Sequence, residues 1–428
     1  MCMKITINPP KKLSGRCLLP SSKSISNRAL IVSALGCEGH KFMSGAAHGL
    51  ENLSDCDDTN VMWKALSLLP DNIDIMAAGT AMRFLTAYLC VCEGERVITG
   101  TERMRNRPIG ILVEALRQLG LQVEYVEKEG FPPLRIRGGA CSKGGSVTLS
   151  GDVSSQYISA LLMIGPVLEE GLTLKLTGQI VSRPYIEMTL NIMRRFGARA
   201  QWVSADSIGV EPTGYKAVPY YVESDWSAAS YWYEMVALSA DGEACMELPG
   251  LFSESLQGDA AVRDMFSALG VETEFCVFGN GLEGVRLRKR GTTVEKMVLD
   301  FTHQPDLAQT VVATCCGMGV PFDFCGLQSL KIKETDRIFA LRRELGKLGF
   351  DIEEGEGGRL RWNGVRGSSL PGAVLDTYED HRMAMCMAPL ALRLGCLEMN
   401  DPKVVSKSYP SYWTHLENIG FNIKEEKV

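Results

Sequence analysis

The sequence has no Cys-x-x-Cys pair, few histidines and no uninterrupted run of 18 apolar residues. Without paired cysteines a disulfide scaffold is excluded, and the fourteen scattered cysteines are expected to be buried thiols in a reducing compartment. The five histidines show no H-x-x-x-H spacing, so we expect no structural or catalytic metal. The lack of a long apolar run excludes a membrane-spanning helix.

Positive charge is also in short supply, because 45 Lys and Arg face 51 Asp and Glu, for a net charge of −6. This balance argues against a general nucleic-acid or anionic-membrane binder, since either needs a surplus of exposed cations. The first ten residues have neither a signal-peptide core nor a transit-peptide composition. We therefore expect a soluble cytoplasmic protein, and its 428 residues predict two to three domains at roughly 150 residues each.

One sequence pattern recurs along the chain: an amphipathic helix that ends in a hydrophobic residue and Gly, followed by a strand of alternating apolar and polar residues. Gly is expected to supply the left-handed residue after each helix, while Pro70 stands in its place in the first copy. The intervals between helix stops are 50, 77, 73, 79 and 71 residues, so the first is short by about 25. The six stops fall at residues 70, 120, 197, 270, 349 and 420.

Each repeat also contains a second kind of helix, rich in Ala, Met, Leu and Ser and nearly free of charge after its first turn. A helix that is apolar on all sides belongs in the interior. Their polar first turns recur once per repeat, which predicts that these ends converge on one place. The six segments are Ser26 to Leu35, Ala81 to Cys90, Ser155 to Met163, Ser227 to Ala237, Asp306 to Cys316 and Arg382 to Leu392.

Six repeats of strands and two helices predict an α/β architecture with strands around a helical core. Grouping three repeats in each lobe places the crossings near residues 21 and 223. The first 20 residues form no repeat of their own, so we expect them to complete the second lobe. The predicted lobes are therefore 21–223, and 1–20 together with 224–428.

Cations recur at the starts of the predicted buried helices, which is unexpected in an acidic protein. Arg matches phosphate and carboxylate with its planar fork, and Lys supplies a point charge. Any one of these residues alone is typical of an exposed surface charge, but the joint pattern predicts a small polyanionic substrate. The residues are Lys23, Arg28, Arg83, Arg107, Lys333, Arg337, Arg382 and Lys407.

Three groups suited to proton transfer lie among these cations. Asp306 follows Pro305 at the start of an apolar helix, where a simple N-cap is the ordinary role. Glu334 stands three residues before Arg337, a spacing typical of a surface ion pair. His381 precedes another buried helix, where a cap-region histidine is the default.

A glycine pattern and a basic run do not indicate a ligand site. Gly279 to Gly284 fits G-x-G-x-x-G, but a strand follows it instead of a helix, so it predicts a hairpin turn. The basic run Arg286 to Arg290 alternates with apolar residues and is typical of a solvated strand face.

Taken together, nine stretches resemble the 5-enolpyruvylshikimate-3-phosphate synthase family over nearly the whole chain. No single stretch is decisive, but their order and spacing are specific. They are Pro20 to Arg28, Ala78 to Arg83, Arg107-Pro-Ile-Gly, Ser154-Ser-Gln156, Ser182 to Tyr185, Pro305-Asp306, Lys333 to Arg337, Asp380-His-Arg-Met-Ala-Met and Asp401-Pro-Lys.

The resemblance implies a two-lobed inside-out α/β barrel, in which each lobe has three βαβαββ repeats and the two lobes close on a cleft. It implies a transferase that moves the enolpyruvyl group of phosphoenolpyruvate to the 5-hydroxyl of shikimate 3-phosphate, releases phosphate, needs no cofactor and acts as a monomer. It implies catalytic roles for Asp306, Glu334, Lys23 and His381. Shikimate 3-phosphate would contact Lys23, Ser24, Arg28, Ser154, Ser155, Gln156, Ser182, Tyr185, Asp306 and Lys333. Phosphoenolpyruvate would contact Lys23, Gly79, Arg107, Gln156, Arg337, Arg382 and Lys407.

The sequence departs from the family pattern in lobe one, where the stretch from Asp58 to Gly79 is short and lacks a strand pair. Ala77 and Ser329 stand where the family has Asn, and Phe84 stands where it has Pro. Two alternatives remain. One is a UDP-N-acetylglucosamine enolpyruvyl transferase, which would need a reactive Cys that the region from Arg103 to Gly110 lacks. The other is a non-catalytic anion-binding relative.

Overall fold

The structure, a computed structural model, describes residues 3–37, 49–139, 143–279 and 281–427. The chain forms two compact units. Lobe one is Ser21–Val222, and lobe two joins the chain up to Pro20 to the chain from Glu223 onward. Glu223, which we had expected at the end of lobe one, therefore belongs to lobe two. Within the described residues no helix is long and apolar enough to cross a membrane.

One four-stranded sheet and two helices make up a complete repeat. In the second repeat of lobe one, β4 and β5 run parallel, and the hairpin of β6 and β7 adds to β5 antiparallel, in the order β4-β5-β7-β6. The buried helix α3 connects the two parallel strands, and the amphipathic helix α5 leads to the hairpin. The bounds are β4 Asn72–Asp74, α3 Gly79–Val91, β5 Gly94–Thr99, α5 Gly110–Gln118, β6 Gln122–Tyr125 and β7 Leu134–Gly138.

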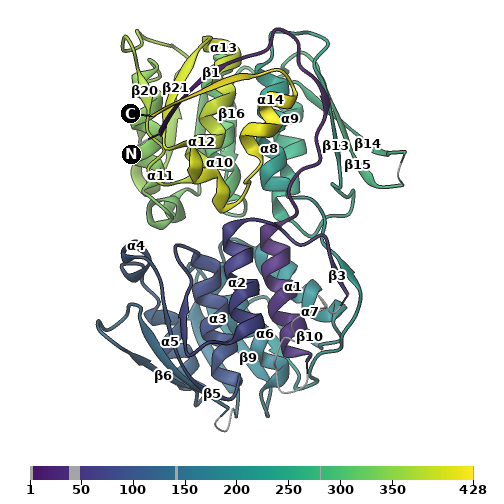
Figure 1. Ribbon diagram of the computed structural model, residues 1–428, viewed down its shortest axis with the longest axis vertical. Helices are drawn as coiled ribbons and strands as arrows, with labels where there is room; N and C mark the ends of the chain where they lie inside the picture. The colour runs from purple at the N-terminus through teal and green to yellow at the C-terminus, as the bar shows by residue number, and fades with distance from the viewer. Residues whose placement is uncertain (1–2, 38–48, 140–142, 280, 428) are drawn as a thin grey trace. The chain divides into compact units, whose positions relative to one another are not determined.

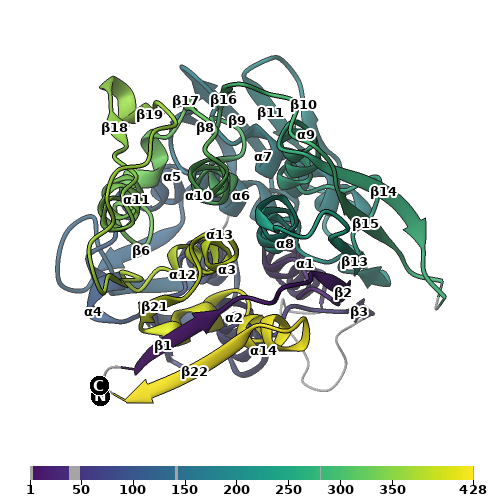
Figure 2. The same ribbon diagram turned by 90° about the horizontal axis from the view of Figure 1, so that it is seen from above.

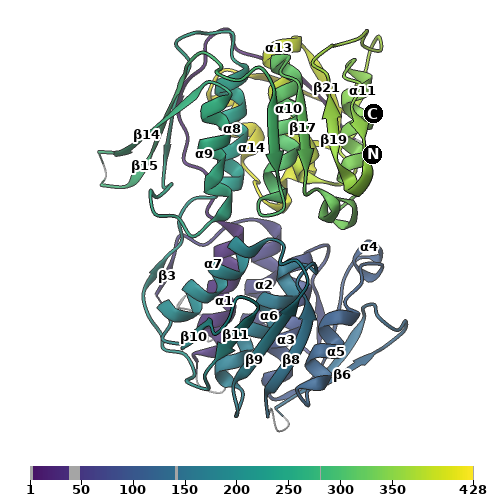
Figure 3. The ribbon, with the colours of Figure 1, turned by 180° about the vertical axis from the view of Figure 1, so that it is seen from behind.

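Four further repeats have the same strand order in their sheets, and two of them take one strand, β2 or β1, from the start of the chain. The third repeat of lobe one is β8 Gly145–Ser150, α6 Ser155–Ile164, β9 Leu172–Thr177, α7 Arg183–Arg195, β10 Ala200–Trp202 and β11 Ser207–Val210 (Figure 3). The first of lobe two is β2 Ser14–Arg16, α8 Trp226–Leu238, β13 Cys245–Pro249, α9 Val262–Ala268, β14 Val271–Val277 and β15 Glu283–Lys289. The second is β16 Met297–Asp300, α10 Ala308–Met318, β17 Phe322–Cys325, α11 Arg337–Lys347, β18 Glu353–Glu354 and β19 Leu360–Trp362. The third is β20 Val374–Leu375, α12 His381–Met387, β21 Leu397–Asn400, α14 Tyr412–Asn418, β22 Asn422–Lys427 and β1 Met3–Asn8.

The first repeat of lobe one is reduced. Its helices α1 (Lys23–Leu35) and α2 (Asp57–Leu68) accompany a two-stranded parallel sheet of β3 (Leu50–Glu51) and β12 (Tyr220–Tyr221). In the described residues this repeat has no antiparallel hairpin, which confirms the shortened first repeat. The two crossings exchange strands, because β2 precedes α1 in sequence but pairs with β13, while β12 precedes α8 but pairs with β3.

The six apolar helices lie inside their lobes, as predicted. In lobe one α1, α3 and α6 contact one another, and in lobe two α8, α10 and α12 do the same, with the sheets around them (Figures 1 and 2). Every residue of α12 is buried, and so is every residue of α1 from Ile25 to Leu35. This arrangement confirms the predicted fold class of strands around a helical core.

Two of the predicted helices differ in detail. Asp306 lies in a separate 3-10 turn, Pro305–Leu307, that precedes α10. The predicted helix from Arg382 to Leu392 is interrupted after α12 by the 3-10 turn Ala388–Leu390, before a short helix resumes. Pro389 in that turn has no backbone N–H to donate, so a regular helix cannot continue through it.

The turn after each amphipathic helix requires a left-handed residue. The five predicted glycines, Gly120, Gly197, Gly270, Gly349 and Gly420, have φ between 82° and 99°. In the first repeat the left-handed residue is Leu69, with φ of 41°, because the ring of Pro70 forbids a positive φ. Leu69 therefore bears a strain that glycine avoids in the other copies.

The cysteines form no disulfide within the described residues. Most are buried, as expected, but Cys325 and Cys396 are exposed and correct that prediction. The two histidines His40 and His48 lie outside the described residues.

A buried acid on α8 predicts a pH dependence of stability. Glu234 is 0% exposed, and neither carboxyl oxygen has a hydrogen-bond partner among the described residues, so burial raises its pKa well above the ordinary value. Above the ordinary carboxyl pKa the unfolded chain releases a proton that the folded protein keeps, so the free energy of unfolding falls as pH rises. We expect a slope of about 1.4 kcal/mol per pH unit at most.

Urea unfolding of the Glu234→Gln variant between pH 6 and 9 checks this expectation, because a neutral amide has no proton to lose. The variant's stability should fall less steeply across that range than the stability of the unchanged protein. Glu243→Gln, which changes an exposed carboxylate in the same lobe, should retain the slope of the unchanged protein. Equal slopes in all three proteins would contradict the role of Glu234.

Candidate active site

Arg337 is the centre of a group of charged side chains in lobe two. It is the first residue of α11 and is 1% exposed. Its Nε atom donates to Asp380 Oδ2 at 2.7 Å, one terminal nitrogen donates to Asp306 Oδ1 at 3.2 Å, and the other to Glu334 Oε2 at 2.9 Å. One guanidinium therefore binds carboxylates from three separate segments.

Asp306 is surrounded by cations. Arg382 donates to its Oδ2 at 2.9 Å and to its backbone carbonyl at 3.2 Å, and Lys333 Nζ lies 3.8 Å from Oδ1. Burial acts to raise the pKa of Asp306, but Arg382, Lys333 and Arg337 hold that pKa well below its usual range. Asp306 is therefore a firmly ionised carboxylate.

The cations and carboxylates form one continuous network. Glu334 accepts from Lys407 Nζ at 3.0 Å as well as from Arg337, and Asp380 accepts from the backbone N–H of Arg382 at 2.9 Å at the start of α12. Lys407 ends the 3-10 segment Pro402–Lys407. We call this network the lobe-two ion cluster; it consists of Lys333, Arg337, Arg382, Lys407, Asp306, Glu334 and Asp380.

His381 lies against this cluster. It is 2% exposed, and its Nδ1 is 3.8 Å from Asp380 Oδ1. The structure thus brings together all the lobe-two residues that the sequence predicted for the site: Asp306, Lys333, Glu334, Arg337, His381, Arg382 and Lys407.

Sequence reasoning missed one acid beside the cluster. Asp259 is 2% exposed and accepts a hydrogen bond from the Ser227 hydroxyl at the start of α8. Burial and the negative charge of Asp306 raise the pKa of Asp259 to about 7. No spacing rule singles out Asp259, because only the fold places its segment beside Asp306.

In lobe one, the predicted residues at the start of α1 have different surroundings. Lys23 Nζ lies 3.3 Å from Asp58 Oδ2, a partner that the sequence did not indicate. Arg28 is 2% exposed and donates to Thr189 Oγ1 at 2.8 Å, Ser159 Oγ at 3.1 Å and the Ser24 carbonyl at 2.9 Å. Burial lowers the pKa of Arg28 to about 10. These three hydrogen-bond acceptors are neutral oxygens, and one of them belongs to Ser24, another residue predicted for the site.

Gly79 and Arg107 are in close contact at the start of α3. A Cβ atom added at Gly79 would lie 2.6 Å from a terminal nitrogen of Arg107, so the guanidinium rests against the glycine backbone. Arg83 donates to the Pro108 carbonyl at 3.0 Å and Tyr157 donates to the same oxygen at 2.7 Å. These bonds hold the segment that follows Arg107.

The remaining predicted residues of lobe one lie at the starts of α6 and α7. Ser154 caps α6 by accepting from the backbone N–H of Gln156 at 3.4 Å, and the Gln156 amide donates to Thr80 Oγ1 at 3.1 Å, which connects α6 to α3. Ser155 is the first residue of α6. Ser182 is left-handed, with φ of 53°, and precedes α7, whose first turn contains Tyr185.

The three departures from the family pattern have different surroundings. Ala77 is half-buried just before α3, and Ser329 is half-buried in the 3-10 segment Gln328–Ile332. Phe84 is fully buried, and its ring centroid lies 5.2 Å from the guanidinium carbon of Arg28. The larger ring at position 84 thus stabilises a buried cation.

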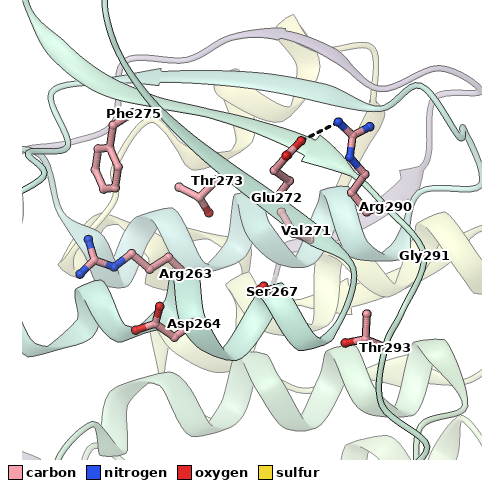
Figure 4. A pocket seen from close by; sticks show the side chains of 10 residues that line it. All are labelled: Arg263, Asp264, Ser267, Val271, Glu272, Thr273, Phe275, Arg290, Gly291 and Thr293. Atoms are coloured by element: carbon pink, nitrogen blue, oxygen red, sulfur yellow. Dashed lines mark hydrogen bonds and ion pairs between the residues drawn. The ribbon is translucent and has the colours of Figure 1, made fainter.

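Lobe two also has a surface hollow, and none of the predicted site residues lines it. It is lined by α9, β14 and the chain after β15, and Arg290 and Glu272 form an ion pair of 2.6 Å at its rim (Figure 4). The strands β14 and β15 form the hairpin that the glycine pattern predicted, and Arg286 pairs with Glu247 and Glu274 on the face of β15. Both interpretations of that region are confirmed.

Comparison with known proteins adds to this geometry. Residues 67–416 match the family described as EPSP synthase (3-phosphoshikimate 1-carboxyvinyltransferase). A protein of that enzyme name from Bacteroides fragilis strain YCH46 is 55% identical over 422 residues, with 99% of each chain covered. Another of that name from Vibrio cholerae serotype O1 strain M66-2 is 38% identical over 439 residues, with 96% of this chain and 97% of the relative covered.

Two solved structures share the fold. An EPSP synthase from Acinetobacter baumannii aligns with a TM-score of 0.76 at 20% identity over 99% of this chain and 100% of that chain. The enolpyruvyl transferase NikO from Streptomyces tendae aligns with a TM-score of 0.69 at 14% identity over 100% of this chain and 99% of the other. The fold is thus shared more widely than the sequence, and it is the sequence match over most of the chain that shows that this protein belongs to the EPSP synthase (3-phosphoshikimate 1-carboxyvinyltransferase) family.

Proposed function

We propose that the protein transfers the enolpyruvyl group of phosphoenolpyruvate to the 5-hydroxyl of shikimate 3-phosphate and releases phosphate, a step in aromatic amino-acid biosynthesis. The observation that carries this proposal is the lobe-two ion cluster, in which four cations surround two carboxylates suited to acid and base roles. Membership of the family, whose relatives are named 3-phosphoshikimate 1-carboxyvinyltransferase, supports it.

Both substrates carry a phosphate, and phosphoenolpyruvate also carries a carboxylate. Arginine can bind either group through two parallel hydrogen bonds, while lysine acts as a point charge. We assign phosphoenolpyruvate to Lys23, Gly79, Arg107, Gln156, Arg337, Arg382 and Lys407. We assign shikimate 3-phosphate to Lys23, Ser24, Arg28, Ser154, Ser155, Gln156, Ser182, Tyr185, Asp306 and Lys333.

The proposed chemistry begins with two proton movements. Glu334 donates a proton to the methylene carbon of phosphoenolpyruvate, which makes the adjacent carbon electrophilic, and Asp306 takes the proton of the attacking hydroxyl. A carbon–oxygen bond forms, and the product of addition is a tetrahedral intermediate. The carbon–oxygen bond to phosphate then breaks, and the departing phosphate takes the proton held by Asp306. The methyl group returns a proton to Glu334, which restores both the double bond and the acid.

Asp306 needs its surroundings to change before it can act as a base. Its low pKa in the free protein depends on Arg382, Lys333 and Arg337, because burial alone would raise it. Substrate anions that share these cations would weaken their hold on Asp306 and raise its pKa toward a useful range. The same cations would stabilise the charge on phosphate as it leaves.

Lys23 and His381 are proposed as further catalytic groups. Lys23 is paired with Asp58, and His381 is packed beside Asp380, so each has a carboxylate that orients it. We propose that both supply positive charge or a hydrogen bond next to the reacting atoms. We also propose that the enzyme is monomeric and cytoplasmic and that it has no nucleic-acid partner.

Gly79→Ala should raise the KM for phosphoenolpyruvate roughly tenfold or more, since each lost charged hydrogen bond weakens binding by about that factor. The new methyl group occupies space now taken by the Arg107 guanidinium, which must move. Folding should not suffer, because alanine favours a helix over glycine by up to about 1 kcal/mol. Steady-state kinetics and thermal unfolding measure the two effects; an unchanged KM would contradict the contact assigned to Arg107.

The experiment that tests the function is phosphate release on mixing shikimate 3-phosphate with phosphoenolpyruvate. We expect release only when both are present. Release with UDP-N-acetylglucosamine in place of shikimate 3-phosphate would favour the sister transferase, and the absence of release with either acceptor would favour a non-catalytic anion-binding relative.

A further inference from the structure

Glu334 forms ion pairs with two of the cations that an anionic substrate would need. Its Oε1 accepts from Lys407 Nζ at 3.0 Å, and its Oε2 accepts from Arg337 at 2.9 Å. The carboxylate thus competes inside the protein with any phosphate or carboxylate that binds to the lobe-two ion cluster. An incoming anion must displace Glu334 from at least one of these cations.

The two cations differ in their freedom to move. Arg337 is 1% exposed and is held at the same time by Asp380 at 2.7 Å and by Asp306 at 3.2 Å. Lys407 is half-buried at the end of its 3-10 segment, and within the described residues its ion pair is with Glu334. Lysine has a flexible four-carbon stem, so Lys407 is the cation that can turn toward an anion.

Movement of Lys407 toward an anion would remove one of the two cations that bind Glu334. Glu334 is in direct contact with Arg337 and Lys407, and its negative charge acts on nearby Asp306. Through Arg337 and Asp306 it is connected to the other charged groups of the site: Lys333, Asp380, His381 and Arg382. The cluster itself has four cations and three carboxylates, one positive charge in excess, so a bound dianion would make its net charge negative. A poorly hydrated carboxylate in such surroundings binds a proton, because protonation costs less than an uncompensated charge.

We propose that capture of an anion by Lys407 and protonation of Glu334 are a single linked event. The inference rests on the proposed function of the same cluster and adds how Glu334 acquires the proton that it donates. Without an anion, Lys407 and Arg337 keep Glu334 ionised and unable to donate. With an anion on Lys407, Glu334 becomes a carboxylic acid beside the phosphate, where the methylene carbon needs a proton.

Sulfate is a suitable probe, because it is a tetrahedral dianion that does not itself titrate near neutral pH. Calorimetric titration in two buffers of different ionisation enthalpy measures the protons taken up on binding. We expect an uptake approaching one proton per bound sulfate near neutral pH. Linkage then requires sulfate affinity to fall as pH rises, by at most about tenfold per pH unit. Sodium chloride of equal ionic strength should produce no such uptake.

Three variants separate the linkage from a general effect of charge. Glu334→Gln should bind sulfate with no proton uptake and roughly tenfold more tightly, since no carboxylate competes for Lys407. Lys407→Gln should bind sulfate more weakly and also lose the uptake. Glu354→Gln is the matched control, because Glu354 on β18 pairs with Lys331 and Arg342 outside the cluster and should leave both quantities unchanged.

Turnover of the unchanged protein is measured separately, so the two proposals can fail independently. Phosphate release without proton uptake would overturn the linkage and leave the proposed function standing. Proton uptake without phosphate release would support the linkage and remove the proposed function. Uptake that persists in Glu334→Gln would also overturn the linkage, because another group would then carry the proton.

Discussion

Asp306→Ala and Glu334→Ala are each expected to lower turnover by roughly 10²–10⁴-fold, the usual contribution of a positioned acid or base. Glu334 is the proposed proton donor to the methylene carbon, and Asp306 is the proposed acceptor of the hydroxyl proton. Both carboxylates contact Arg337, and Asp306 is also bound by Arg382. The rate of phosphate release at saturating substrates measures the loss.

Isosteric variants distinguish lost proton transfer from lost packing. Asp306→Asn and Glu334→Gln keep the size of each side chain and its capacity to accept a hydrogen bond, but neither amide can take or give the proton. We expect both to be nearly as impaired as the alanine variants, with circular dichroism spectra like that of the unchanged protein. Glu354→Gln should turn over normally, whereas near-normal turnover in either Asp306→Asn or Glu334→Gln would contradict the role assigned to it.

Arg337→Met should lower the free energy of unfolding by about 3–5 kcal/mol, which is typical when one partner of a buried ion pair is removed. Asp380 is 0% exposed and would lose its hydrogen bond of 2.7 Å from the Arg337 Nε atom. Asp306 and Glu334 would lose a cation as well. Urea unfolding near neutral pH measures the change.

The matched control for this prediction lies on the same helix. Arg342 is half-exposed and pairs with Glu354 at 3.0 Å, so Arg342→Met should cost less than about 1 kcal/mol. The double variant Arg337→Met with Asp380→Asn should recover part of the loss, since it leaves one fewer buried charge without a partner. Equal destabilisation by Arg337→Met and Arg342→Met would mean that burial of the ion pair is unimportant.

Local patterns predicted the features that depend on neighbouring residues in the chain. A buried helix needs an apolar surface on every side, and the end of a helix followed by a strand needs a residue with positive φ. Both conditions can be recognised within about a dozen residues, which is why α1, α6 and the turn at Gly349 were predicted correctly. Pro389 was also visible in the sequence, but its effect on the last buried helix was overlooked.

Pairings between distant segments were not predictable in this way. The bond of Lys23 to Asp58, the closeness of Asp259 to Asp306 and the attachment of both Lys407 and Arg337 to Glu334 depend on which helix starts the fold brings together. No local pattern predicts that β2 and β12 exchange sheets at the two crossings either. Charge spacing along the chain indicated a surface ion pair for Glu334, whereas tertiary packing places it in a largely buried network.

By itself the sequence determined the repeats, the buried and amphipathic helices, the turns between them and the residue types suited to anion binding, because these depend on periodicity and on backbone preferences over short distances. Only the tertiary structure decided which charges are paired, which are desolvated and which carboxylates compete with a substrate. The physical reason is that a carboxylate's ionisation depends on the charges and solvent within a few ångströms of it, and folding sets those neighbours from segments far apart in the chain.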